Sequence, residues 1–142
     1  MASEQSTDAL TKHVLQSMMH DDVSMVVRRD CLILEFGKSL LQKVGATKHE
    51  YIAQRLRQLG RLVLTLRKLG DGDYLKDFLK PERFDMVVEG VQQISVMTTG
   101  AVEMTCGVPS LSLKLGYSLK KCVLILQGLA LRQRDSHQLE EA

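Results

Sequence analysis

The feature that most constrains the fold of this chain is a regular apolar stripe between residues 47 and 70. Its members recur at steps of four, three, four and three residues: Ile52, Leu56, Leu59, Val63 and Leu66. At about 100° per residue, this spacing predicts one face of a helix, and that face must be buried in a core. Three cations, Arg57, Arg61 and Lys68, fall on the opposite side of the same helix. The stretch therefore predicts a helix that is apolar on one side and basic on the other.

Helical spacing recurs along the rest of the 142-residue chain, which has two prolines and little of the strict alternation typical of exposed strands. With three Phe, three Tyr and no Trp, the core must be filled mainly by aliphatic side chains. A chain of this length can bury one core without disulfide or metal support. We therefore predict an all-α fold, a single-domain bundle of about five main helices plus one short helix.

Capping residues and apolar spacing place the predicted elements along the chain. The main helices are expected at 7–20, 30–45, 47–70, 81–97 and 110–134, and the short helix at 74–79. Asp30 and Asp73 are expected to cap the second and the short helix, and Gly45 to end the second. Residues 1–6 are predicted to be a disordered N-terminus, 7–134 the helical bundle domain and 135–142 an acidic C-terminal tail. No structure is assigned to residues 23–27.

Two of the predicted helices have wide apolar surfaces. Helix 81–97 is expected to bury Phe84, Val87, Val88, Val91 and Ile94, and Gly90 in its interior indicates a close helix crossing. The stripe of helix 110–134 consists of Leu115, Leu119, Cys122, Leu126 and Leu129, with a second row of Leu113, Leu124 and Leu131. A helix that is apolar over so much of its circumference is expected at the centre of the bundle.

The chain lacks the sequence signatures of catalysis. It has no nucleophile elbow, no phosphate-binding loop and no zinc-protease motif, and its four histidines are scattered among polar residues. Its three cysteines form no C-x-x-C pair and are expected to be reduced and mostly buried, while residues 20–22 are expected to form a solvated turn. We therefore expect a protein that is not an enzyme and that uses no cofactor or metal. Since neither a signal peptide nor a membrane-spanning run is evident, we expect it inside the cell.

Positive charge is concentrated locally, although the net charge is only +2. Between residues 48 and 68 there are six Lys or Arg residues and one Glu. Guanidinium and ammonium groups on one helix face can neutralise nucleic-acid phosphates. The candidate nucleic-acid-binding residues, which include a second cluster on the last helix, are Arg57, Arg61, Lys68, Lys114 and Lys121. The alternative is that these cations form an ordinary solvated surface.

A second hypothesis is a protein-interaction or self-association module that binds no nucleic acid. Residues 97–107 have no helical period and are expected to form the longest loop. Its apolar residues Ala101, Val102 and Met104, together with the wide last helix, are the candidate partner-binding residues. Binding to a membrane surface is less favoured, because the apolar stripe of helix 47–70 is needed for the core.

Several segments resemble an uncharacterised family of animal proteins. They include Arg57-Gln58-Leu59-Gly60-Arg61 and, above all, the string PSLSLKLGYSLKK at residues 109–121. The others are Arg29-Asp30, Leu32-Ile33, Phe36-Gly37 and Tyr51-Ile52. In that family, a helical segment of this kind precedes a region similar to the tyrosine recombinases of mobile elements.

The resemblance, which covers roughly residues 22–131, implies a part or a shortened relative of a recombinase-like protein that acts on or near DNA. A nuclear location would follow. The H-x-x-R element of the recombinase active site is missing from this sequence, so its tyrosines inherit no nucleophilic role. The chain departs from the family in its more apolar 97–107 segment and at Tyr117, where a histidine is common. These departures leave room for a different partner surface.

Overall fold

The computed structural model describes residues 10, 13–18, 20–99 and 110–141, and all regular structure within them is helical. The α-helices are α2 (Asp22–Arg29), α3 (Cys31–Val44), α4 (His49–Leu69), α5 (Leu75–Phe78), α6 (Phe84–Thr99) and α8 (Ser110–Glu141). Three 3-10 turns accompany them: η1 (Leu15–Ser17), η2 (Ala46–Lys48) and η3 (Pro81–Arg83). The predicted all-α, single-domain bundle is confirmed.

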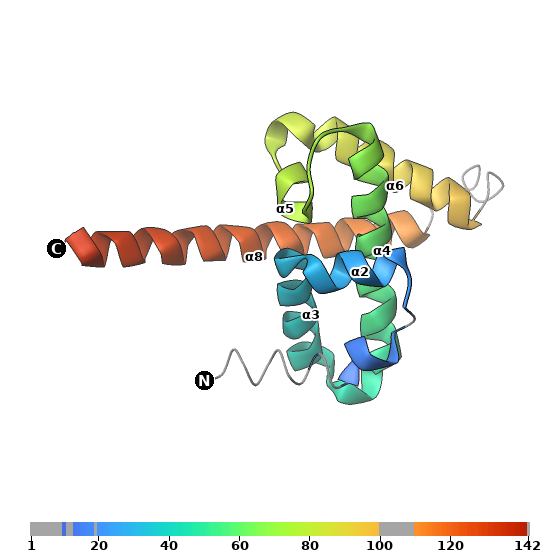
Figure 1. The fold of residues 1–142 in the computed structure, drawn as a ribbon, viewed down its shortest axis with the longest axis horizontal. Helices are drawn as coiled ribbons and strands as arrows, with labels where there is room; N and C mark the ends of the chain where they lie inside the picture. The colour runs from blue at the N-terminus through green and yellow to red at the C-terminus, as the bar shows by residue number, and fades with distance from the viewer. Residues whose placement is uncertain (1–9, 11–12, 19, 100–109, 142) are drawn as a thin grey trace.

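The central element is α4, which contacts α2, α3, α6 and α8 (Figure 1). All five residues of its predicted apolar stripe are completely buried. Two glycines allow the neighbouring helices to come close. A Cβ atom on Gly60 would lie 3.0 Å from the carbonyl oxygen of Val23 in α2, and one on Gly90 of α6 would lie 2.9 Å from Leu66. The close crossing predicted at Gly90 is confirmed.

The N-terminal part of the structure differs from the prediction. A helix is expected at 7–20. The structure has the 3-10 turn η1 within this range, and much of the rest of the range lies outside the described residues. The unassigned residues 23–27 belong to α2. Asp21 caps this helix through a reciprocal pair of bonds with Ser24, so the expected solvated turn is in fact a helix start.

Asp30 connects two helices. One of its carboxylate oxygens accepts hydrogen bonds from the backbone N–H groups of Leu32 and Ile33, as predicted for the cap of α3. The other oxygen accepts a bond of 2.7 Å from the N–H of Leu75, at the start of α5. The cap predicted at Asp73 is wrong, because the carboxylate of Asp77 occupies that role and accepts from the backbone of residues 73 and 74. Gly45, with a φ of 84°, ends α3 as expected.

The last helix is not at the centre of the bundle, contrary to the prediction. α8 crosses the body and then projects beyond the other helices (Figure 1). Leu115 and Cys122 are buried against the core, whereas Leu113, Leu124 and Leu131 are 64%, 52% and 60% exposed. The helix continues to Glu141, through the residues predicted to form an acidic tail.

Candidate functional site

The three predicted cations of α4, Arg57, Arg61 and Lys68, form its basic stripe. This stripe borders α2. Arg57 donates from its two terminal guanidinium nitrogens, Nη1 and Nη2, to the two carboxylate oxygens of Asp21, at 3.1 and 2.5 Å. This contact, followed by the hydrogen bond from the Ser24 backbone, lowers the pKa of Asp21 to about 2. Because Arg57 already has a carboxylate partner, it is less available for a phosphate than a solvated arginine would be.

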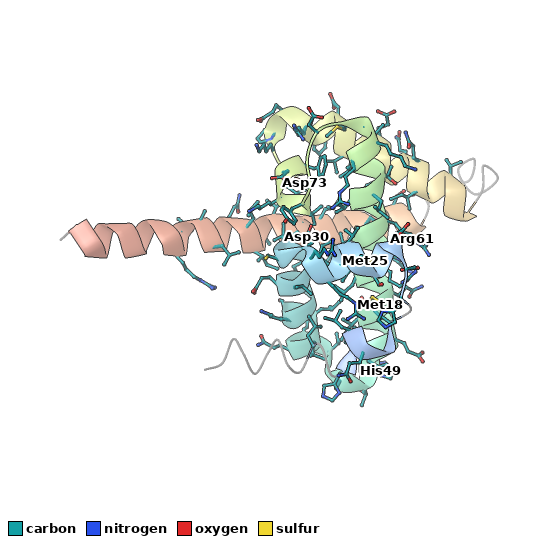
Figure 2. All side chains as sticks on the ribbon, in the orientation of Figure 1. Met18, Met25, Asp30, His49, Arg61 and Asp73 are labelled. Atoms are coloured by element: carbon teal, nitrogen blue, oxygen red, sulfur yellow. The ribbon has the colours of Figure 1, made fainter. Side chains whose placement is uncertain are left out.

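The other two cations of this stripe, Arg61 and Lys68, are exposed. Arg61 lies at the side of α4 near the start of α2 (Figure 2), and its charge also lowers the pKa of Asp21. The sequence placed all three cations on a free face because α2 had not been predicted. A D-x-x-S capping signal at residues 21–24 could have revealed that helix.

A second group of cations surrounds Tyr117 of α8. The ammonium group of Lys43 in α3 donates a 3.0 Å hydrogen bond to the Tyr117 hydroxyl. Lys121 lies one turn further along α8, with its nitrogen 5.9 Å from the centre of the same ring. The bond from Lys43 lowers the pKa of Tyr117, and the same bond raises the pKa of Lys43. The charge of Arg55 in α4 also lowers the pKa of Tyr117. Cations from three helices, Lys43 of α3, Arg55 of α4 and Lys121 of α8, therefore act on this hydroxyl.

Arg55 and Arg57 point to nearly opposite sides of α4, since two residues correspond to about 200° of helix rotation. Arg55 stacks over the ring of Tyr51 at 5.0 Å, and its buried Nη1 has no hydrogen-bond partner among the described residues. The cations of α4 are thus divided between two surfaces. The structure brings Lys121 and Lys43 to the same ring, that of Tyr117, and Lys43 was not among the candidate residues predicted from the sequence. Lys114 is exposed on α8.

The basic surface continues along α3 and α8. A groove of about 560 Å³ between these helices is lined by Lys38, Lys121 and Arg132, among others. Glu35, the one acidic residue among its described lining groups, forms an ion pair with Lys38 at 3.1 Å. Cations therefore predominate on this side of the molecule.

A mainly apolar groove of about 860 Å³ lies between α6 and α8, and we call it the α6/α8 groove. Phe84, Val88 and Val91 form its α6 wall, and Leu119 and Val123 belong to its α8 wall. At one end, the two helices are joined by a 2.7 Å hydrogen bond between the hydroxyl groups of Ser95 and Ser112. They separate away from this end (Figure 1).

The groove exists because one side of α6 remains uncovered. Helical spacing predicts Phe84 and Val88 in the core, but they are 66% and 38% exposed. Val87 and Ile94 are buried as expected, on the side of α6 that packs against α4. The apolar stripe of α6 is wider than the surface that α4 and α8 cover, so its outer part faces solvent. The prediction of burial was wrong at these two positions.

The predicted partner-binding residues Ala101, Val102 and Met104 lie outside the described residues. The other part of that prediction, the wide apolar surface of α8, is described: its exposed row begins at Leu113. Cys31 is exposed, whereas Cys122 is buried and its pKa is raised to about 12 by burial. Across the described ranges, no group of acidic, His or Cys residues is arranged to hold a metal ion, and no helix is long and apolar enough to cross a membrane.

Comparisons with known proteins identify no relatives: no family model matches the chain, and no match is found among curated proteins or among solved structures.

Proposed function

We propose that the protein is a binding module that holds a partner protein in the α6/α8 groove. The observation that carries this proposal is the exposure of Phe84, at 66%, beside the exposed Val88 on one wall of an 860 Å³ apolar groove. Contiguous apolar surface in a concave site is typical of places where partners bind. Both walls are helices of four or more turns, so the groove is formed before a partner arrives.

Two valines on α6 offer a matched test of the groove. Val88 lines it, whereas Val96 is similarly exposed, at 41%, but is not among its lining residues. Helical peptides selected on the wild-type protein from a displayed library should lose at least tenfold in affinity for Val88→Asp. They should bind Val96→Asp as they bind the wild type. Selected peptides that bind both variants equally, or the recovery of no peptide, would contradict the proposal.

A second candidate function is binding of duplex DNA through phosphate contacts, as the family resemblance implies. The gathering of Lys43, Lys121 and Arg132 along α3 and α8 favours it, and the exposed Arg61, Lys68 and Lys114 could add further contacts. Such a module would work beside a recombinase-like region of a nuclear protein.

This candidate is tested by titrating a fluorescent random-sequence duplex at about 50 and about 200 mM salt, where several phosphate contacts weaken binding by orders of magnitude. The double variants Lys43→Glu/Lys121→Glu and Arg61→Glu/Lys68→Glu identify the surface used. Arg57 is left intact, because its bond to Asp21 stabilises α2. Absence of binding at the lower salt concentration would exclude this function.

A further inference from the structure

We propose that the occupant of the α6/α8 groove is an amphipathic helix with acidic side chains along the edge of its apolar face. This inference rests on the proposed function and adds the chemistry of the partner to it. Two features of the groove carry it, namely the backbone chemistry of its walls and the sign of its charged groups.

The walls of the groove favour a helical partner. Both α6 and α8 satisfy their own backbone groups, so they offer no free edge with which an extended strand could pair. A helix needs no such edge, because its backbone hydrogen bonds are internal. The α6 wall extends from Phe84 to Gln92, which at 1.5 Å per residue is about 12 Å, or two helical turns. The groove can therefore receive apolar side chains from two or three successive turns of a partner helix.

The charged groups of the groove favour acidic residues in that helix. Lys80 and Lys120 are both exposed and line it, and none of its described lining residues is Asp or Glu. The acidic residues Asp85 and Glu89 lie on the outer side of α6. Measured as rotation about the helix axis, they are about 60° and 100° away from Val88. An acidic edge on the partner would therefore face α8 and Lys120, where it gains attraction and avoids the carboxylates of α6.

The test uses two synthetic, hydrocarbon-stapled helical peptides with leucines at i, i+3 and i+7. One peptide has glutamates beside the leucines and the other has lysines at the same positions. In fluorescence anisotropy at about 50 mM salt, the glutamate peptide should bind at least tenfold more tightly than the lysine peptide. Lys120→Glu should remove this preference, whereas Lys114→Glu, at an exposed position of α8 outside the groove, should preserve it.

The outcomes separate this inference from the proposed function. Equal binding of the two peptides, abolished by Val88→Asp, would overturn the acidic partner but leave the groove as a binding site. Binding of neither peptide would contradict both. If the protein forms a dimer that Val88→Asp dissociates and that excludes the glutamate peptide, a second copy occupies the groove and the inference is wrong.

Discussion

The side chain of Asp30 caps the start of one helix and binds the start of another. It is 1% exposed, and its carboxylate accepts backbone hydrogen bonds at the starts of both α3 and α5 (Figure 2). Loss of a helix cap costs about 0.5–2 kcal/mol, and a buried unsatisfied N–H costs about 1–3 kcal/mol. Asp30→Ala should therefore lower the free energy of unfolding by about 2 kcal/mol or more.

Urea denaturation followed by circular dichroism measures this loss, with the exposed Asp22 changed to Ala as the control. Asp30→Asn should lose less than Asp30→Ala, because its amide oxygen can still cap α3 while its NH₂ group cannot accept from Leu75. Equal stabilities of Asp30→Ala and Asp22→Ala would show that the double cap contributes little.

Asp21 gives the stability of the protein a specific pH dependence. Arg57 holds the folded-state pKa of its carboxyl at about 2, below the ordinary value of 3.8. A depressed carboxyl pKa stabilises the fold above pH 3.8, and this contribution is lost as the pH falls toward 2. Asp21→Asn should therefore lower the melting temperature at pH 5 by more than at pH 2, where much of the contribution is already lost. Melting curves across this range, with Asp22→Asn for comparison, check the effect; a difference that is the same at every pH would refute the assignment.

At the scale of the helices, local sequence patterns predict features that depend on residues a few positions apart. They do not predict contacts between segments that are distant in the sequence. The apolar stripe of α4 and the cap at Asp30 were predictable, because periodicity and capping act within a few turns. The bond from Arg57 to Asp21 joins residues 36 positions apart, and that from Lys43 to Tyr117 joins residues 74 apart. The exposure of Phe84 likewise depends on where α8 passes. No periodicity within one helix contains this information.

Gly60 is required where α2 crosses α4, whereas Gly128 in the outer part of α8 is not required by any neighbour. A Cβ atom at Gly60 would press on the backbone of α2, while one at Gly128 would meet nothing within 4 Å. Alanine favours a helix by about 1 kcal/mol over glycine. Gly128→Ala should thus stabilise the protein by up to about 1 kcal/mol. Gly60→Ala should destabilise it by about 1 kcal/mol, because overpacking outweighs that gain. Urea midpoints that move in the same direction for both variants would contradict this reading of the crossing.

At the scale of the whole molecule, one apolar cluster joins the ends of the described chain. It extends from Leu10 and Val14 near the N-terminus, through α4, to Leu115 and Cys122 of α8. Since no part of this cluster is a separate core, we expect α8 to unfold together with the rest of the bundle. The projecting part of α8 does not alter this expectation, because the completely buried residues of α8 in the described part of the chain, Leu115 and Cys122, lie in its first half.

Cys122 can report this cooperativity, because its thiol is completely buried and burial raises its pKa to about 12. The thiolate is the reactive form, so a disulfide reagent at pH 8 should modify Cys122 only when the helix leaves the core. In a Cys31→Ser/Cys106→Ser background, the urea midpoint for labelling after a short pulse should coincide with the midpoint measured by circular dichroism. Labelling at lower urea than the loss of helix would mean that α8 detaches first. One wall of the α6/α8 groove would then be a mobile element, and the groove would not be formed before its partner arrives.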